Sequence, residues 1–494
     1  MAVKAVEDLK ERLAGIVGET SVNDDRNDLL QYARPGGDGD GHLPACVVRP
    51  VNPEQVTALV VLANETGLNL VPVSSGPPHA RGGTTPESGA VMVDLSAMDR
   101  IVRMDRRNKV AIIEPGVTFG RLASEASKVG LKVLMPLLPR QRKSVLASYL
   151  EREPIIIPKY HWDATDPLLC MEVVFGTGDL FRTGSAAGPG SLEQQWEHGE
   201  AQKNPMGPGQ TDFGRLVQGA QGTMGIVTWG SVKLEVMPST HRIYFVEDSL
   251  ERLIEFAYPV LRRKMADEFL ILNGTAFATM MRGGAAEIGD LAGRIPGHVL
   301  VLGISGYEYF PEERVTYLVN DMADLAKEAG VALTRSAAGV DHLEAERALS
   351  GPSGEPYHKH RMKGGSRDLF FLTTLDRVPA FTAAMESLAQ EHGHPVEEIG
   401  TYIQPIQHGR TVHLEFDIYF DSGSAKDAAR AGGLFSAASK ACQEMGGFFS
   451  RPYGPWADMA FAACPDTVDA LLKVKRVLDP RGVMNSNKLC FKEA

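Results

Sequence analysis

The sequence contains few cysteines, and those are scattered. Five occur among its 494 residues, namely Cys46, Cys170, Cys442, Cys464 and Cys490. None forms a Cys-x-x-Cys pair, which argues against an iron–sulfur cluster, a structural zinc site and a disulfide framework. Scattered thiols in a chain without a recognisable export signal predict a cytoplasmic protein.

Three other features are absent. No apolar run reaches the length of a membrane-spanning helix. The net charge of −11, without any basic block, argues against nucleic acid or an anionic membrane as a partner. There is no Gly-x-Gly-x-x-Gly motif, so a nicotinamide is not the expected electron acceptor. The remaining composition, with 43% hydrophobic and 23% charged residues, is that of a globular chain of two or three domains.

Short strands and helices alternate through the first 130 residues. A strand is predicted at 45–50, and Asn52 is placed to cap a helix that Gly67 ends. Further strands are predicted at 91–95 and 110–116 and a helix at 119–129. This alternation favours an α/β or α+β layer over a helical bundle.

A loop of small residues follows the apolar run 68–73. It reads Ser74-Ser-Gly-Pro-Pro-His-Ala-Arg-Gly-Gly83. Small residues let a ligand approach the backbone, and successive N–H groups can form a nest for phosphate oxygens. A single cluster of this kind is more often an ordinary surface turn.

Several segments together resemble one family of flavoproteins. Pro44-Ala-Cys-Val-Val-Arg-Pro and Glu114-Pro-Gly-Val-Thr flank the loop, and three glycine- or asparagine-bearing segments follow at 171–184, 219–228 and 474–488. In this order they resemble the vanillyl-alcohol oxidase and para-cresol methylhydroxylase (PCMH-type) family, which includes glycolate oxidase and D-lactate dehydrogenase subunits. The resemblance implies an FAD cofactor and makes the loop 73–83 the expected pyrophosphate site.

The resemblance also implies which residues contact FAD. They are Val73, Ser74, Ser75, Gly76, Pro77, Pro78, His79, Ala80, Pro136, Ser144, Ser148, Gly222, Thr223, Gly225, Ile226, Val227, Asn485 and Lys488. Prolines replace expected glycines at 77 and 78, so we expect the Ser74 and Ser75 hydroxyls to supply part of the phosphate contact. Some relatives attach the flavin covalently to a histidine of this loop. His79 is the candidate for that bond here, with a capping or packing role as the alternative.

The implied architecture is of the α+β class. A PCMH-type FAD-binding domain is expected at 1–238, an α+β cap domain with an antiparallel sheet at 239–445, and a C-terminal return to the FAD domain at 446–494. The sequence supports the cap independently, since strand-then-helix units occur at 298–330 and at 411–445.

The strand 411–420 alternates strictly. Its apolar positions predict one buried face, and His413, Glu415, Asp417 and Tyr419 share the other. That polar face looks either at solvent or into the cleft over the flavin. In the second case His413 and Glu415 are candidates for substrate binding or proton removal.

The segment Gly447-Phe-Phe-Ser-Arg-Pro-Tyr-Gly-Pro-Trp456 lies where the phenol-oxidising relatives hold a phenolate with a Tyr and an Arg. Arg451 can pair an oxyanion, and Tyr453 and Trp456 can stack a ring. The same arginine could bind the carboxylate of a hydroxy acid, or the segment could be a structural turn. His408 and His413 differ in strand parity, so no metal site is predicted.

Lys159, Tyr160 and His161 form a cluster of acid–base and aromatic groups. If this segment passes the flavin ring, a cation there would stabilise the anionic reduced form. An ordinary surface loop is the alternative, and these three residues complete the set of catalytic candidates.

The predicted function is FAD-dependent oxidation of an alcohol or 2-hydroxy acid, with hydride passing to flavin N5. Oxidation of a para-substituted phenol is the first alternative, and a non-catalytic flavin-fold subunit is the second. The expected partners are a small-molecule substrate and either oxygen or an electron-carrier protein. A homo-oligomer is compatible with the sequence, which determines neither the oligomeric state nor the acceptor.

Overall fold

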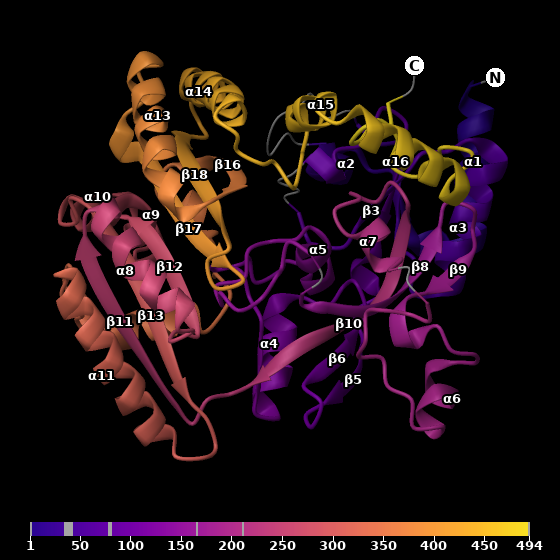
Figure 1. The fold of residues 1–494 in the computed structure, drawn as a ribbon. Helices are drawn as coiled ribbons and strands as arrows, with labels where there is room; N and C mark the ends of the chain where they lie inside the picture. Colours follow the sequence, from indigo (N-terminus) through magenta and orange to yellow (C-terminus); the bar gives the residue numbers. More distant parts are fainter. Residues whose placement is uncertain (1, 34–42, 78–81, 165, 210–211, 493–494) are drawn as a thin grey trace.

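The structure is a computed structural model that describes residues 2–33, 43–77, 82–164, 166–209 and 212–492. Two groups of elements stand side by side in Figure 1. One contains the N-terminal half of the chain together with the C-terminal helices, and the other contains the segment between them. Among the described helices, none is both long and apolar enough to cross a membrane.

A small sheet carries the serine- and glycine-rich loop. Its strand order is β1 (Val22–Asn23), β2 (Cys46–Val48), β4 (Val91–Asp94) and β3 (Leu70–Val73), and the last three are parallel. Helix α3 (Pro53–Thr66) connects β2 to β3, and helices α1 (Ala2–Val17) and α2 (Arg26–Ala33) precede them. The Asn52 side chain accepts a hydrogen bond from the Gln55 N–H, and Gly67 ends α3 at φ +75°, which confirms both predicted helix ends.

The second sheet is antiparallel and carries the other glycine-rich segment. Its order is β5 (Ile101–Asp105), β6 (Val110–Ile113), β10 (Gly225–Val236), β8 (Leu168–Phe175) and β9 (Leu180–Arg182), and β7 (Leu131–Val133) pairs with β10. Helices α4 (Phe119–Lys128), α5 (Val145–Leu150), α6 (Leu192–Glu197) and α7 (Gly214–Val217) connect or flank these strands. The long strand β10 therefore starts at the glycine-rich segment 219–225.

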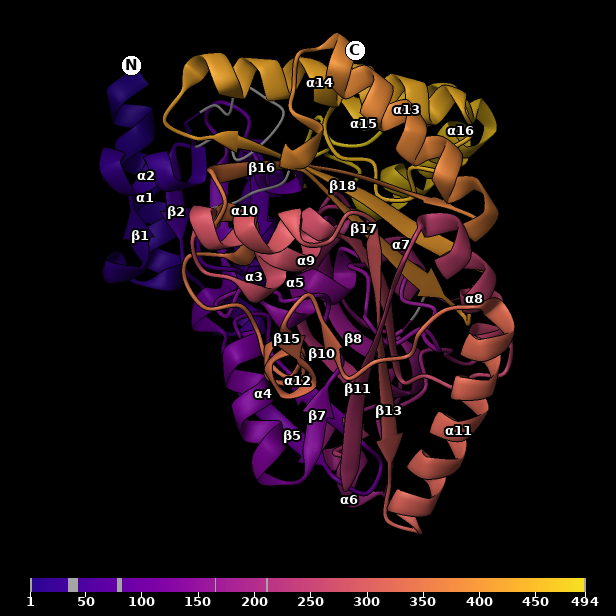
Figure 2. The same ribbon diagram turned by 90° about the vertical axis from the view of Figure 1, so that its left-hand side faces the viewer.

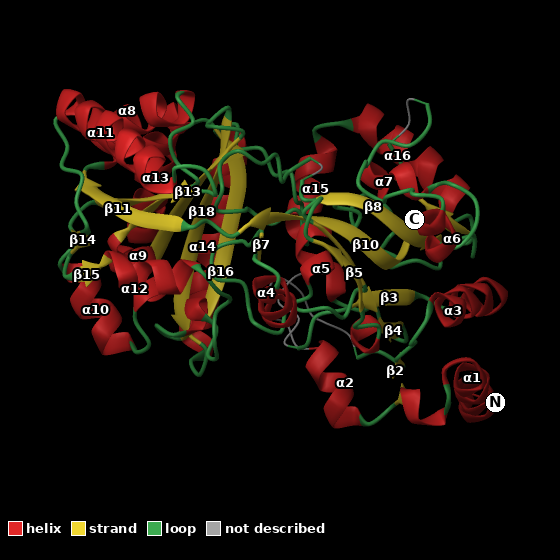
Figure 3. Cartoon of the chain, turned by 90° about the horizontal axis from the view of Figure 1, so that it is seen from below, coloured by secondary structure: helices red, strands yellow, loops and turns green. Residues whose placement is uncertain are grey.

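The third sheet has six antiparallel strands. Their order is β11 (Thr240–Asp248), β13 (His298–Gly306), β12 (Glu268–Asn273), β17 (Ile399–Ile406), β18 (Thr411–Asp421) and β16 (Gly364–Thr373). A two-stranded ribbon, β14 (Ser336–Ala337) with β15 (Val340–Asp341), accompanies it. Seen from below in Figure 3, this sheet is separate from the first two.

Helices cover both faces of the third sheet. One core contains side chains of α8 (Leu250–Arg262), α11 (Pro311–Ala329), α13 (Val378–Glu391) and α14 (Ala425–Glu444). A second core, on the opposite face, contains side chains of α9 (Gly274–Met281), α10 (Ala285–Gly293) and α12 (His342–Leu349) and of segment 134–162. Figure 2 shows α13 and α14 beyond the strands β16 and β18, with α9 and α10 on the other side. The apolar residues of β18 lie in the first of these cores, so its polar face turns away from α13 and α14.

The C-terminal segment returns to the first two sheets. Helix α15 (Pro455–Ala462) and helix α16 (Pro465–Leu478) lie above them in Figure 1. The buried Lys475 ammonium bonds the Thr223 carbonyl and the Asp479 carboxylate, and Asp479 in turn accepts from the Val483 N–H. This network attaches the tail to the glycine-rich segment. The predicted α+β class with an antiparallel cap sheet is confirmed, and the division at about 238 and 445 stays a prediction.

Candidate active site

A large cavity runs between the two glycine-rich segments and the third sheet. Its volume is about 2560 Å³, and part of this volume is open to solvent. One end is lined from the first two sheets and the other from the polar face of the strands β16–β18. The cavity therefore joins the predicted flavin residues to the predicted substrate residues.

Eight of the predicted flavin-contacting residues line this cavity. They are Val73, Ser74, Ser75, Pro136, Gly222, Gly225, Ile226 and Val227. A Cβ on Gly222 would lie 2.5 Å from the Pro72 ring, and one on Gly225 would lie 2.5 Å from the Val174 carbonyl oxygen. Only glycine at these two positions lets the segment 222–225 lie so close to Pro72 and Val174.

The hydroxyl of Ser75 is already part of the local structure. Its Oγ accepts a hydrogen bond from the Ser144 N–H at 3.0 Å, which leaves the O–H proton of Ser75 available to a ligand. Asn485 connects the two glycine-rich segments, because its side-chain amide donates to the carbonyls of Gly83 and Gln221. The Oδ1 atom of Asn485 is buried and has no hydrogen-bond partner among the described residues.

Three predicted flavin contacts use their hydroxyl groups inside the fold, and their contact with FAD stays a prediction. The Ser144 hydroxyl donates to the Pro115 carbonyl and caps α5, Ser148 donates to Glu153, and Thr223 donates to the Ala220 carbonyl. These three do not line the cavity.

The remaining predicted flavin contacts lie outside this lining or outside the described residues. Lys488 lies outside the lining, 3.7 Å from the Glu87 carboxylate. Gly76 and Pro77 line a neighbouring polar cavity beside Arg49 and Arg142. Pro78, His79 and Ala80 lie outside the described residues, so covalent attachment at His79 stays a prediction.

The chemistry of this end fits FAD. The hydroxyls of Ser74, Ser75 and Thr85 and the Arg140 guanidinium line it, and such donors suit a pyrophosphate. An aliphatic strip of Leu95, Leu146, Ile226 and Val227 suits a flat ring system. Asn485 is not itself in the lining, but its amide bonds two residues that are, Gly83 and Gln221. When bound, FAD supplies the acceptor for a hydride.

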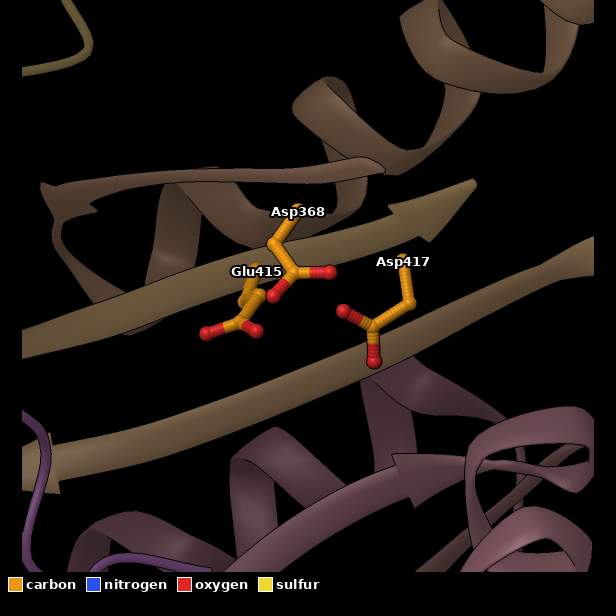
Figure 4. Close-up of side chains that lie close together, drawn as sticks. All are labelled: Asp368, Glu415 and Asp417. Atoms are coloured by element: carbon orange, nitrogen blue, oxygen red, sulfur yellow. The ribbon is translucent and has the colours of Figure 1, made fainter. Parts of the chain in front are cut away.

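At the other end three carboxylates meet. Asp368 on β16 lies directly opposite Asp417 on β18, and Glu415 projects from the same face two residues away. Figure 4 shows the three carboxyl groups turned towards one another. Like charges directly opposite in a sheet are destabilising, so this arrangement requires a compensating cation.

The compensating cation is Lys359, on the short turn His358–His360. Its Nζ lies 3.1 Å from Asp368 and 2.7 Å from Asp417 and also bonds Glu415. The carboxyl oxygens are close enough together to hold a metal ion. The ammonium contacts all three, so it provides the positive charge that a metal would supply. The absence of a metal site, expected from the sequence, stays a prediction.

The pKa values of the two β18 carboxyls, Glu415 and Asp417, shift in opposite directions. Burial by itself raises the pKa of Glu415, but the Lys359 ammonium and the His413 hydrogen bond bring it well below its ordinary value. Burial, together with the charges of Asp368 and Glu415, holds the pKa of Asp417 well above its ordinary value despite Lys359. Two carboxyls whose pKa values are pushed apart can take different roles in acid–base chemistry.

His413 and Arg451 lie behind this polar wall rather than in the cavity lining. His413 is fully buried, its Nε2 is 2.6 Å from Glu415 Oε2, and its Nδ1 is 3.3 Å from Arg451 Nη2. Because a guanidinium only donates, Nδ1 is the acceptor and Nε2–H donates to Glu415. The Arg451 guanidinium carbon lies 4.0 Å from the centre of the Phe370 ring, which lines the cavity. Arg451 therefore reaches the cavity lining through Phe370, and its direct contact with substrate stays a prediction.

Of the remaining catalytic candidates, one lines the cavity and three do not. Tyr453 lines it beside Trp456. Lys159 and Tyr160 bond the Glu235 carboxylate on β10, and His161 uses its backbone N–H to bond Asp166. None of the three lines the cavity, and Glu235 bonds the side chains of Lys159 and Tyr160, so a role of this segment in acid–base chemistry stays a prediction.

Sequence reasoning missed Lys359 and Asp368. A signal was present, since positions 366, 368 and 370 alternate with the buried positions 369 and 371, as in a strand with one cavity face. Lys359 lies between two histidines in a charged run that resembles an exposed turn. Its burial depends on which strands lie beneath it, and the sequence alone does not show that.

Acidification is expected to destabilise the fold through its buried histidines. Burial lowers the pKa of His413 to about 4 and that of His358 to about 3, so the unfolded chain binds more protons between those values and 6.5. Stability then falls as pH decreases, by roughly 2 kcal/mol per histidine between pH 7 and pH 5.

Urea unfolding at both pH values checks this prediction. The variant His413→Gln should lose less stability on acidification than the wild type, whatever its absolute stability. His198→Gln, at an exposed position, is the control and should follow the wild type. An unchanged pH dependence in His413→Gln would contradict the assignment of a neutral buried His413.

Comparison with known proteins agrees with this geometry. Residues 44–146 match the family described as FAD binding domain. The chain is 27% identical to glycolate oxidase subunit GlcD of Bacillus subtilis over 48% of its length, an alignment that spans 46% of that protein. It is 22% identical to the 4-cresol dehydrogenase [hydroxylating] flavoprotein subunit of Pseudomonas putida, over 86% of this chain and 84% of that one. It is 24% identical to D-lactate dehydrogenase of Anaerostipes hadrus, over 91% of this chain and 90% of that one.

The fold is also that of a solved flavoprotein. The crystal structure of p-cresol methylhydroxylase with substrate bound superposes with a TM-score of 0.82 and 19% identity, covering 98% of this chain and 97% of that one. This likeness extends across all three sheets and the C-terminal return. The predicted resemblance is confirmed: residues 44–146 match an FAD binding domain, the chain has the fold of p-cresol methylhydroxylase, and it is similar in sequence to FAD-dependent dehydrogenases.

Proposed function

We propose that this chain oxidises a neutral hydroxylated compound, an alcohol or a para-substituted phenol, at a bound FAD. The observation that carries the substrate class is the charge of the cavity wall. Asp368, Glu415 and Asp417 all contact one ammonium, that of Lys359, so these carboxyls outnumber the cation that they share. These carboxyls disfavour an anionic substrate and accept a hydroxyl group as a hydrogen-bond donor.

Aromatic side chains next to this wall support a ring-bearing or apolar substrate. Phe370, Tyr402, Phe435, Tyr453 and Trp456 all line the cavity. Phe370 meets Trp456 edge to face at 5.0 Å, which keeps both rings in place. The relative named 4-cresol dehydrogenase is consistent with such a substrate.

A 2-hydroxy acid is the second candidate. It is favoured by the relatives named glycolate oxidase and D-lactate dehydrogenase, the second of which aligns with nearly the whole chain. Cations for its carboxylate exist in the cavity lining, namely Arg140, Lys143 and Arg367. Lys143 is already paired with Glu151 and Glu153, at 2.9 and 2.6 Å, which weakens it as a carboxylate site.

Arg451 and His413, which lie behind the three carboxyls, orient Glu415. Arg451 sets the His413 tautomer, and His413 then holds Glu415 by a donated hydrogen bond. Tyr453 remains a candidate for substrate contact. Oxygen or an electron-carrier protein would reoxidise the flavin, and the cytoplasmic location and the oligomeric state remain expectations from the sequence.

Absorption spectroscopy of the purified protein tests the proposal. We expect flavin bands in the visible spectrum and anaerobic bleaching by vanillyl alcohol or para-cresol. D-lactate and glycolate should bleach the flavin slowly or not at all, because their carboxylates approach a wall rich in carboxyl groups. Faster bleaching by the hydroxy acids would establish the second candidate, and a protein that binds no FAD would refute both. A flavin-containing protein that no hydroxyl compound reduces would support the non-catalytic subunit.

A further inference from the structure

The ammonium of Lys359 is surrounded by carboxyl groups. A lysine ammonium has three N–H groups, and this one donates to Glu415 and Asp417 and lies 3.1 Å from Asp368. Lys359 is nearly buried, with 8% of its surface exposed, and it lines the cavity together with the three carboxyls. A substrate in the cavity therefore meets carboxyl groups whose positions depend on this ammonium.

The carboxyl oxygens of the cluster differ in the hydrogen-bond partners that the protein gives them. Glu415 uses Oε1 for Lys359 and Oε2 for His413, and Asp368 uses Oδ2 for Lys359 and Oδ1 for the Ser366 hydroxyl at 2.7 Å. Asp417 uses Oδ1 for Lys359, while its Oδ2 has only a long contact of 3.4 Å from the Tyr419 hydroxyl. Asp417 Oδ2 is therefore the carboxyl oxygen of the cluster with the weakest protein partner, and Asp417 lines the cavity.

We propose that Asp417 Oδ2 accepts the proton of the substrate hydroxyl, and that Lys359 is the positioning residue that holds the three carboxyls around it. This inference rests on the proposed function, since it requires a substrate that releases a hydroxyl proton. It differs from the expectation based on sequence, which gave proton removal to His413 and Glu415.

The proton step balances within the site. The substrate O–H bond breaks, an O–H bond forms on Asp417 Oδ2, and the negative charge moves from Asp417 to the substrate oxygen. The total charge of site and substrate is unchanged. The departing hydride electron pair needs an oxidant, which is the bound flavin.

Every element around Asp417 contributes a group that influences this step. Lys359 acts on Asp417 from the turn, Asp368 from β16, Tyr402 from β17, and Glu415 and Tyr419 from β18. His358 and His360 flank Lys359, Arg367 precedes Asp368, and His413 and Arg451 lie behind Glu415. Charges of both signs therefore lie near Asp417. Burial and the neighbouring carboxylates raise the pKa of Asp417, which makes it a stronger proton acceptor than an ordinary aspartate.

Infrared difference spectroscopy tests the cluster without any substrate. Between low and high pH, the protein should show the carbonyl band of a protonated buried carboxyl that titrates well above ordinary aspartate. The band should be missing in Asp417→Asn and present in the control Asp469→Asn, which makes the same change at an exposed position of α16. An unaltered band in Asp417→Asn would overturn the inference.

Anaerobic flavin reduction tests the role in catalysis. With the best alcohol or phenol, Asp417→Asn should be reduced roughly 10²–10⁴-fold more slowly than the wild type, the loss expected for a missing general base. Its FAD content should equal that of the wild type. Unchanged reduction in Asp417→Asn would overturn the inference and leave the proposed function intact. If no hydroxyl compound reduces the wild type, the proposed function fails, and the infrared result still decides the protonation of the cluster.

Two substitutions separate positioning from a merely structural role of Lys359. The rate of reduction should fall at acidic pH in the wild type as Asp417 becomes protonated. Lys359→Met should move this fall to higher pH, since an adjacent cation disfavours protonation of a carboxyl. Lys359→Arg keeps the charge and should restore most of the profile. An equal loss of rate at every pH in both variants would refute the positioning role.

Discussion

Replacing Gly222 with alanine is expected to yield a folded protein that purifies with little or no FAD. Gly222 lies in the cavity lining with φ +75°, a conformation that costs an alanine about 1–2 kcal/mol. Its Cβ would also lie 2.5 and 2.9 Å from two ring atoms of Pro72, on the strand that leads into Ser74 and Ser75. Relieving this overlap moves one glycine-rich segment away from the other, and both line the predicted FAD site.

The expected size of the effect follows from strain and overpacking together. Overpacking in a close-packed region typically costs about 1–3 kcal/mol, so the total corresponds to roughly 30- to 3000-fold weaker FAD binding. Absorbance of the purified protein and titration of the apoprotein with FAD measure it.

Gly67→Ala is the matched control for this prediction. Gly67 has the same φ of +75°, but a Cβ at this position would have nothing within 4 Å, and the residue ends helix α3 away from the cavity lining. The variant should lose some stability and keep its FAD. A yellow Gly222→Ala protein with unchanged affinity for FAD would contradict the placement of the cofactor.

Replacing Lys359 with methionine is expected to destabilise the substrate-free protein by about 3–5 kcal/mol at neutral pH. The substitution removes the cation and leaves Asp368, Glu415 and Asp417 close together in a largely buried site. Their repulsion is relieved when they take up protons. The deficit relative to the wild type should therefore be larger at pH 8 than at pH 5, the opposite of the acid destabilisation expected from the buried histidines.

Urea unfolding midpoints of the apoprotein at both pH values measure this effect. Lys440→Met is the control, because Lys440 is largely exposed and 3.9 Å from Glu444, and such a surface pair contributes about 0–1 kcal/mol. A deficit in Lys359→Met that stays constant between pH 5 and pH 8 would show that the three carboxyls do not repel one another. The ammonium would then have no compensating role.

Local sequence patterns predicted much of the fold correctly. The ends of helix α3 follow from Asn52 and Gly67, because the cap hydrogen bond and the left-handed residue involve only near neighbours. The two faces of β18 follow from its alternation, since one face must be buried under helices. In both cases the information lies within a few residues of the feature.

The candidate site was predicted only in part, because its polar contacts join distant segments. Lys159 and Tyr160 looked like active-site groups, but Glu235, some 75 residues later, takes both. Arg451 looked like a substrate anchor, yet the structure places it behind Phe370 and against His413. Residue types alone do not show which polar partner a side chain will find.

The sequence by itself determined the cofactor class, the two glycine-rich segments and the polar face of β18. These depend on backbone conformation and on strand alternation, which are local properties. Only the tertiary structure decided that Asp368 stands opposite Asp417 and that Lys359 provides their counter-charge. The physical reason is strand register: the pairing of β16 with β18 joins residues about fifty positions apart, and charges separated by that much sequence interact only once the sheet has formed.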